Sequence, residues 1–476
     1  MNDYDFVVEG TYEGNWIFPM SKDSAYGTLI IEKEFMTLRI LINNSIQWKW
    51  KETLNINGRA FKQKKNEKQK TCEFYFLLHD LRILKHTNSG STFHELVFDV
   101  REAYMSINPN IDFSSINNCI IRTELLDKWC WKHIKDSFVH TSKSAGYEQN
   151  LEYKQKEHYT CFEDKKSKVL LYFGTQTIYP SVNGFHIINK CFLNINFNKN
   201  TKFDDAYFFT ERVCYLFSLL WGVAYEPEYV EFRADRNKFI YTNKGEAKYL
   251  NRFEKIGLEP FTELTDFNSN QLNKVFNKWL KLFDKKHEAL VLYSETILND
   301  RLSPKNIIKN LLSVIDGLTE EAKTEGKSKS PKRERTINTL LEKCSQLTRT
   351  EKNIIKTGFL RETGSELKPR FKELLLEIKG YPPYEYIKNS LVEKEKGITE
   401  DKQKDEIIFD FADSIVDTRN YLTHPKNHRG NIIPTEKYSE YAYILKKILQ
   451  AYLMQKVNVP KKGGRNLNCV SKEKYY

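Results

Sequence analysis

The chain has 476 residues, enough for two or three domains that each bury a sizeable core. It holds 75 Lys and Arg residues against 63 Asp and Glu residues, a formal net charge of +12. No apolar run is long enough to span a membrane, and residues 1–5 lack the basic and apolar regions of a signal peptide. These features argue against a membrane-embedded or exported protein, and we expect a cytoplasmic one.

Eight cysteines are scattered singly, with no Cys-x-x-Cys pair and no Cys/His cluster at zinc spacing. No cluster of Asp, Glu, His or Cys has the spacing of another metal site. We therefore expect free thiols in a reducing compartment, no bound metal and no cofactor.

Residues 1–200 have the pattern of short β-strands. Apolar residues alternate with polar ones over residues 36–42 and again over residues 95–100. Repeated short strands separated by turn residues predict an antiparallel sandwich or barrel. Trp129 and Trp131 are interpreted as packing anchors rather than a base-stacking platform, because aromatic side chains dominate core burial.

From about residue 204 the period of the apolar residues becomes helical. Two apolar stripes, over residues 206–220 and 272–283, repeat every three or four residues. We interpret residues 201–300 as a helical region that bridges the β-rich domain and the carboxy-terminal part of the chain.

Residues 301–460 are predicted to form an all-α bundle of about five helices. Ser303 and Pro304 have the order of a helix cap followed by proline at the first helical position. Further apolar stripes cover residues 308–315, 337–347, 371–378, 408–422 and 441–452. Residues 324–333 are expected to form a basic loop, and residues 461–476 a basic mobile tail. The fold class predicted for the whole chain is therefore α+β.

The positive charge is concentrated in the predicted bundle. Residues 1–300 hold 40 Lys and Arg residues against 39 Asp and Glu residues, whereas residues 301–476 hold 35 against 24. A lysine-rich composition alone would not produce this difference between the two parts. Because a positive field attracts phosphate groups irrespective of their sequence, we expect an RNA partner at this part of the chain.

One predicted helix ends with an arginine and a histidine separated by four residues, Arg419 and His424, followed by Pro425. Arg419 falls on the apolar stripe of its helix, where another apolar residue is expected. The stripe consists of Ile408, Phe411, Ala412, Ile415 and Leu422. RNA cleavage needs a permanent cation that holds a phosphate and a group with a pKa near 6.5 that moves a proton, and Arg and His supply these.

We expect His424 in a frayed last helical turn, because Pro425 disfavours helical geometry at the residue before it. The imidazole could then turn toward Arg419. His424 is the candidate for proton transfer, Arg419 for the charge that develops on the phosphoryl oxygens, and Asn420 for holding the substrate or the imidazole. The opposing interpretation is that Arg419 extends to solvent and His424 caps the helix end.

The run from Arg419 to His424 resembles the Arg-Asn-x-Leu-Thr-His run of ApeA-type HEPN domains. The front half is similar, more loosely, to the amino-terminal domain that accompanies this HEPN domain. This likeness rests on residues 14–19, 26–29, 113–115, 126–129 and 212–220. In the family the first bundle helix often carries a Glu and a following His, whereas here the acid is Asp316 and the His is absent, so Asp316 is interpreted as a helix-surface carboxylate.

The resemblance implies a bacterial anti-phage protein whose endoribonuclease activity halts the infected host, with residues 1–200 as a sensor or regulatory domain. It implies cleavage of cellular RNA, tRNA among the candidates, without a metal ion. It also implies a homodimer formed through the HEPN domain and a phage-derived activator. His428 is a second candidate acid or base, although its polar surroundings are typical of a surface histidine. The alternative function is a non-catalytic HEPN module that binds RNA or takes part in a toxin–antitoxin pair.

Overall fold

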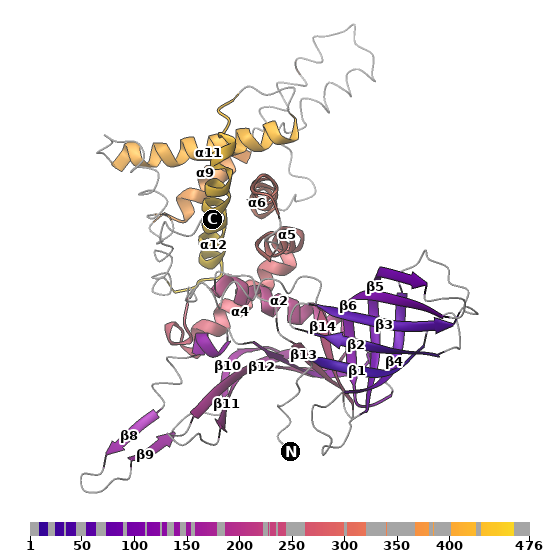
Figure 1. Cartoon of the computed structure of the whole chain (residues 1–476). Helices are drawn as coiled ribbons and strands as arrows, with labels where there is room; N and C mark the ends of the chain where they lie inside the picture. The colour runs from indigo at the N-terminus through magenta and orange to yellow at the C-terminus, as the bar shows by residue number, and fades with distance from the viewer. Residues whose placement is uncertain are drawn as a thin grey trace. The chain divides into compact units, whose positions relative to one another are not determined.

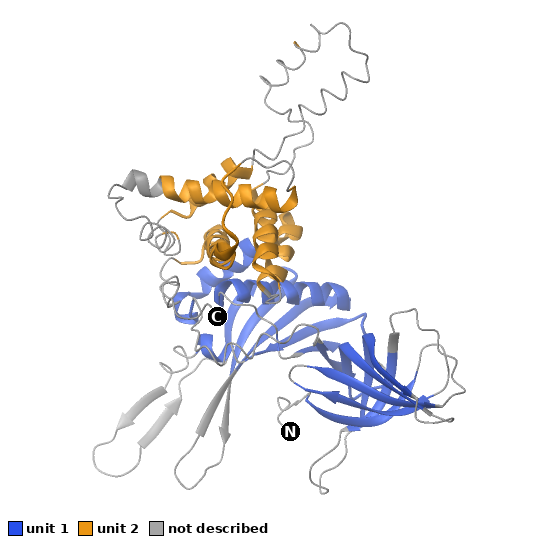
Figure 2. Ribbon diagram, turned by 45° about the horizontal axis from the view of Figure 1, so that its top comes forward, with its two compact units in different colours: residues 1–280 blue, residues 281–476 orange. Residues whose placement is uncertain are grey.

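In the computed structural model the described residues are 9–17, 24–32, 35–43, 54–62, 73–88, 93–109, 112–123, 126–130, 138–142, 149–153, 158–178, 186–221, 227, 229–234, 237–243, 262–298, 302–319, 339, 367–379, 384, 401–424 and 430–460. The chain divides into two compact units, residues 1–280 and 281–476 (Figure 2). The predicted basic loop 324–333 and tail 461–476 lie outside the described residues, as does nearly all of the predicted helix 337–347.

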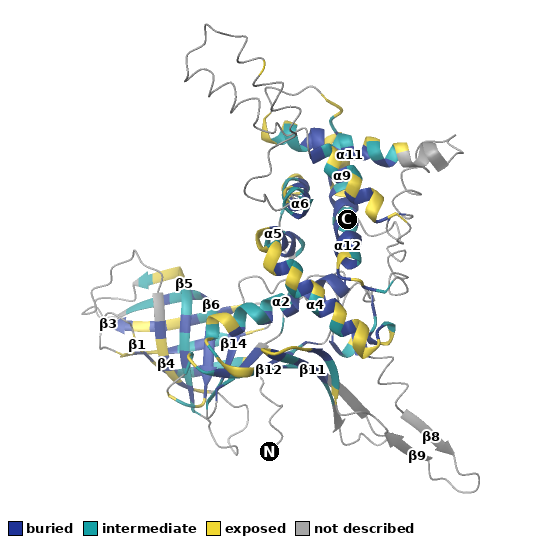
Figure 3. Cartoon of the chain, turned by 180° about the vertical axis from the view of Figure 1, so that it is seen from behind, coloured by how far each residue is buried: buried dark blue, intermediate teal, exposed yellow. Residues whose placement is uncertain are grey.

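The first unit begins with six antiparallel strands that close into a barrel (Figure 1). They pair in the order β6, β3, β2, β1, β4 and β5, and β5 then pairs with β6. The strands are β1 (Gly10–Ile17), β2 (Ser24–Ile31), β3 (Met36–Asn43), β4 (Leu54–Lys62), β5 (Glu73–Asn88) and β6 (Phe93–Ser106). The predicted alternation is confirmed, since every second residue of β3 from Met36 to Ile42 is buried (Figure 3).

Aromatic rings and glycines together fill the barrel. The ring of Tyr12 lies edge-on to that of Phe76, with 5.0 Å between centroids. Trp16 is fully buried, and its ring covers Gly58 so closely that a Cβ atom at residue 58 would overlap it. Glycine is required at residue 58 because only a residue without a side chain leaves room for the indole.

A second group of strands extends the sheet beyond the barrel. It has the order β10, β11, β12, β7, β13 and β14, and β14 pairs with β6. These strands are β7 (Ile116–Arg122), β10 (His158–Glu163), β11 (Ser167–Ile178), β12 (His186–Thr201), β13 (Tyr229–Ala234) and β14 (Asn237–Asn243). A separate hairpin is formed by β8 (Phe138–Ser142) and β9 (Gln149–Tyr153). The prediction of an antiparallel β-rich region is confirmed, but β13 and β14 lie within residues 201–300, which we expected to be helical. The helical period of the flanking stripes does not extend to these two strands, which complete the sheet between β7 and β6.

Helix α2 (Phe203–Trp221) packs against β7 and β12, so residues that begin the predicted bridging region belong to the first unit. Trp129 is buried beside this helix. Its indole N–H donates to Thr262 Oγ1 at 3.2 Å, and its ring lies edge-on to Phe217. The interpretation of Trp129 as a packing anchor is confirmed, while Trp131 lies outside the described residues.

Helix α4 (Ser269–Lys285) comes after the short 3₁₀ helix η2 (Leu264–Asp266). Within the first unit, the α4 residue Trp279 donates its indole N–H to the carbonyl oxygen of Arg212 at 2.8 Å. Phe276 stacks on Phe162 of β10. The apolar stripe predicted over residues 272–283 is therefore the packing face of this helix.

The second unit is helical, which confirms the predicted carboxy-terminal all-α region. Helix α6 contacts α5, α9, α11 and α12 and is the centre of the described bundle. The helices are α5 (His287–Leu298), α6 (Pro304–Thr319), α9 (Leu367–Glu377), α11 (Asp401–Thr423) and α12 (Tyr438–Lys456), with the 3₁₀ helix η5 (Thr435–Lys437) before α12. The predicted start of α6 is confirmed, because the helix begins at Pro304 and Ser303 Oγ accepts a hydrogen bond from the Asn306 N–H.

Gly317 explains how closely α5 and α6 approach each other. A Cβ atom at residue 317 would lie 3.0 Å from the Cβ of Ala289, and Lys286 Nζ donates to the Gly317 carbonyl oxygen at 2.9 Å.

Among the described helices, none is both long and apolar enough to cross a membrane.

Candidate functional site

Helix α11 carries the Arg/His motif, and its buried face becomes more accessible toward its end. Ile408, Phe411 and Ile415 are buried as predicted, and Phe411 stacks on Tyr441 of α12 at 5.1 Å. In the last turn, the stripe positions occupied by Arg419 and Leu422 are only half-buried. The stripe therefore holds the helix in the bundle but leaves its carboxy-terminal end open to solvent.

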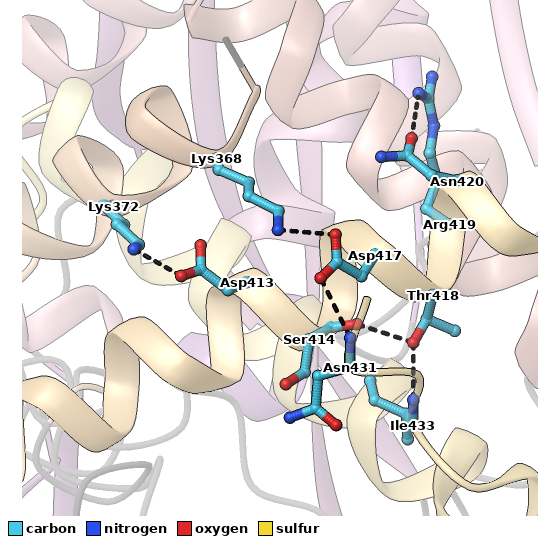
Figure 4. A network of polar contacts seen from close by, with 10 residues as sticks. All are labelled: Lys368, Lys372, Asp413, Ser414, Asp417, Thr418, Arg419, Asn420, Asn431 and Ile433. Carbon is cyan, nitrogen blue, oxygen red and sulfur yellow. Dashed lines mark hydrogen bonds and ion pairs between the residues drawn. The ribbon is translucent and has the colours of Figure 1, made fainter. Parts of the chain in front are cut away.

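Arg419 and Asn420 lie side by side at this end. Arg419 Nη1 donates to Asn420 Oδ1 at 3.4 Å, a long hydrogen bond, and both side chains are half-buried. Figure 4 shows both side chains pointing away from Asp417 and Thr418. With respect to the described residues, this contact leaves most of the guanidinium N–H groups available for an anion.

The acidic residues of α11 nearest to Arg419 are engaged elsewhere. Asp417 Oδ1 forms an ion pair with Lys368 Nζ at 2.6 Å, and Asp413 Oδ2 forms one with Lys372 Nζ at 2.7 Å. Both lysines belong to α9. Within the described parts of the chain, no carboxylate pairs with Arg419. Its charge is therefore not neutralised by its own helix.

His424 is the first residue after α11 and is exposed. We expected a frayed last turn, but the backbone N–H of His424 still donates to the Asn420 carbonyl oxygen at 2.7 Å. The physical reason is that Pro425 restricts the dihedral angles of the preceding residue without removing the N–H of that residue. Pro425 and His428 themselves lie outside the described residues. The backbone of His424 is held by the helix, while its side chain faces solvent.

The structure also identifies two residues that the sequence analysis missed. Asp417 and Thr418 accept hydrogen bonds from the backbone N–H groups of Asn431 and Ile433. The signal in the sequence is a pair of polar residues on the buried side of a helix, directly before the motif arginine. Such a pair is unexpected on an apolar stripe unless each side chain has a partner.

The basic residues of α9 do not provide free positive charge. Besides Lys368 and Lys372, Arg370 forms an ion pair through Nη2 with Asp316 Oδ1 of α6 at 2.6 Å. This contact agrees with the interpretation of Asp316 as a helix-surface carboxylate. In the described residues no group of three or more His, Cys, Asp and Glu side chains could hold a metal ion.

Two family models match the chain, and together they cover most of it. The model of ApeA N-terminal domain 1 matches residues 11–280, and the model of the Apea-like HEPN domain matches residues 309–462. The chain belongs to the ApeA-like HEPN family. Arg419, Asn420 and His424 all lie in the HEPN match. No curated protein and no solved structure matches the chain.

Membership of the ApeA-like HEPN family indicates a nuclease-type role in anti-phage defence. HEPN domains are generally associated with ribonucleases, commonly act on RNA and commonly form dimers. The motif at the end of α11 is thus the candidate site of this activity in the second unit.

Proposed function

We propose that this protein is a metal-independent endoribonuclease that cuts cellular RNA, with tRNA among the candidate substrates, in anti-phage abortive infection. The observation that carries the proposal is the end of α11. There the half-buried Arg419 has no carboxylate partner among the described residues, and five residues later His424 is exposed to solvent. A permanent cation that binds a phosphate and an imidazole that moves a proton are two of the groups that phosphodiester transfer uses.

In the proposed reaction the 2′-hydroxyl of the RNA attacks the adjacent phosphorus, and the bond from phosphorus to the 5′-oxygen breaks. The products are a 2′,3′-cyclic phosphate and a 5′-hydroxyl end. His424 transfers a proton, Arg419 stabilises the charge on the phosphoryl oxygens, and Asn420 orients Arg419 or the substrate. Every role falls to side chains of this chain, so no metal ion is needed.

The direct test is cleavage of total cellular RNA by the purified protein in excess EDTA, with the product ends identified by mass spectrometry. Activity with cyclic or 3′-phosphate ends supports the proposal. Arg419→Ala and His424→Ala should each abolish cleavage. Arg82→Ala and His158→Ala, which replace exposed residues of the first unit, should not. A strict magnesium requirement with 3′-hydroxyl ends would indicate another class of nuclease, and binding without cutting would indicate the non-catalytic alternative.

We further propose that the working site is built from two chains. Transfer between a 2′-hydroxyl and a 5′-oxygen needs a proton acceptor and a proton donor on opposite sides of the phosphorus, whereas one helix end supplies one histidine. A two-fold contact beside α11 would bring two copies of the motif together. Mixing Arg419→Ala with His424→Ala chains should then give a heterodimer whose activity differs from that of either parent. An active protein that sediments as a monomer would refute this arrangement.

A phage-derived activator and a sensing role for residues 1–200 complete the proposal. RNA ends should be sequenced from infected cells that carry either the wild type or His424→Ala. That comparison identifies the RNA that is cut and shows whether cutting depends on infection. Cutting without infection would contradict the need for an activator.

A further inference from the structure

Residues 431–433, here called the returning segment, follow α11 in the described part of the chain. Asn431 and Ile433 of this segment contact the helix through their backbone N–H groups (Figure 4). The N–H of Asn431 donates to Asp417 Oδ2 at 3.3 Å, and the N–H of Ile433 donates to Thr418 Oγ1 at 2.9 Å. The contacted side chains lie one and two positions before Arg419. The returning segment is therefore fastened to the same turn that carries the motif arginine.

The hydroxyl of Thr418 is a specific anchor. Thr418 is fully buried and Ile433 is 4% exposed, so water does not compete for this hydrogen bond. The same hydroxyl donates to the Ser414 carbonyl oxygen at 2.7 Å, so it acts as donor and acceptor at once. Loss of the hydroxyl would leave the buried N–H of Ile433 without its acceptor, which is costly in a dry environment.

Asp417 provides a second anchor that is tied to another helix. Its carboxylate is divided between two partners, with Oδ1 accepting from Lys368 of α9 and Oδ2 accepting from the N–H of Asn431. Asp417 is 9% exposed. Because Lys368 restricts the orientation of the carboxylate, Oδ2 remains directed at the returning segment.

The side chain of His424 is not held in place by hydrogen bonds of its own among the described residues. It is exposed, and among the described residues no side chain forms a hydrogen bond with its imidazole. Its backbone is held on one side by the bond to the Asn420 carbonyl oxygen. On the other side, the nearest fixed points along the described chain are Asn431 and Ile433. Because the chain is held on both sides of His424, this residue samples a smaller range of positions.

We propose that Asp417 and Thr418 are positioning residues of the nuclease site, which set the location of His424 relative to Arg419 by fastening residues 431–433 to α11. The inference rests on the proposed function, because it assumes that His424 moves a proton. Neither residue touches the reacting atoms. Their effect on the rate comes from the geometry of the histidine, and displacement of a catalytic group by about an ångström is enough to slow a reaction severely.

The test uses the full-length protein and three variants with RNA as substrate. Thr418→Val keeps the shape of the side chain and removes the hydroxyl, whereas Thr418→Ser keeps the hydroxyl. Thr319→Val is the matched control. Thr319 Oγ1 also donates to the carbonyl oxygen four residues earlier, that of Ile315, but among the described residues no backbone N–H of a returning segment donates to it. We expect Thr418→Val to lower kcat about 10-fold with KM nearly unchanged. Thr418→Ser should retain most of the wild-type kcat, and Thr319→Val should not change it.

Hydrogen exchange measured by mass spectrometry gives a readout that does not depend on activity. Exchange in the peptide that contains Asn431 and Ile433 should rise in Thr418→Val and stay unchanged in Thr319→Val. If Thr418→Val does not fold, Asp417→Asn replaces it, since this change removes the charge that binds Lys368 with little change in shape. Faster exchange with an unchanged kcat would overturn the inference while His424→Ala remained inactive. Full activity of His424→Ala would instead overturn the proposed function.

Discussion

In the first unit several residues that carry the family likeness belong to the wall and core of the barrel, whereas in the second unit such residues lie at a helix end that solvent reaches. Gly14, Trp16 and Gly27 are buried, and side chains at the two glycines would overlap the neighbouring strands. Arg419 is half-buried and His424 is exposed. The two sets of residues therefore have different roles: one makes the barrel close, and the other is accessible for chemistry.

The charged residues of the second unit show the same division. Lys368, Arg370 and Lys372 of α9 all form ion pairs with acids of neighbouring helices. Arg419 forms none with the described carboxylates. A basic composition alone does not reveal which cations can bind a phosphate, because paired cations add little to the field. Substitutions in the two units should accordingly affect different measured quantities.

Among the substitutions considered below, Arg419→Lys is expected to have the largest effect on RNA cleavage. Lysine keeps the positive charge but lacks the planar fork that binds two phosphoryl oxygens, so cleavage should fall about 10²-fold. The free energy of unfolding should change by less than about 0.5 kcal/mol, because the side chain is at the surface of the bundle. RNA cleavage rates and urea unfolding measure the two quantities. Equal rates for Arg419→Lys and wild type would show that a point charge suffices.

Trp16→Ala should produce the opposite result. Removing this fully buried indole should lower the free energy of unfolding by about 3–5 kcal/mol, because a large cavity remains in the barrel. Molecules that stay folded should retain the motif of the second unit. Urea unfolding followed by fluorescence, with cleavage rates corrected for the folded fraction, measures both. A smaller loss would mean that the barrel collapses around the missing ring.

Gly58→Ala tests the same packing from the other side and should have a smaller effect. The added methyl group would overlap the ring of Trp16, and overpacking of this kind costs about 1–3 kcal/mol. The double variant with Trp16→Phe should lose less stability than the two single changes together, because the smaller ring leaves room for the methyl group. Strict additivity would show that the strain at residue 58 comes from the backbone.

The smallest effect concerns Lys447 of α12. Burial and, to a smaller extent, the charge of Lys446 lower the pKa of its ammonium group to about 7. The folded pKa lies below the unfolded one, so between about pH 7 and pH 10 the unfolded chain binds more protons, and stability should rise with pH. Between these pH values the free energy of unfolding of the wild type should rise by about 1 kcal/mol more than that of Lys447→Met. The effect is modest because the side chain is half-buried and its charge is partly screened by solvent. Urea unfolding at about pH 7 and pH 9 measures this difference. If the free energies of unfolding of the two proteins changed equally with pH, the lowered pKa of Lys447 would be contradicted.

Local periodicity is enough to predict much of the fold. The alternation from Met36 to Ile42 predicts a strand buried on one side, and the stripe of Ile308, Leu311 and Ile315 predicts a helix with one packed face. Both predictions are confirmed because one-sided burial imposes the period of the element on its apolar residues. The motif at Arg419 and His424 is also recognisable in the sequence, because an arginine stands at a helix position where the apolar stripe predicts an apolar residue.

The contacts between distant residues could not be predicted in the same way. The residue pattern was sufficient for the strand-rich first part, the helical second part, the family and the Arg/His motif. It did not indicate that α2 packs on the sheet of the first unit, that Lys368 neutralises Asp417, or that Thr418 holds Ile433. Each of these contacts depends on which segments meet in space and on the direction in which a side chain leaves its helix. Neither property is encoded in the period of a single element, so both emerge only when the whole chain is packed.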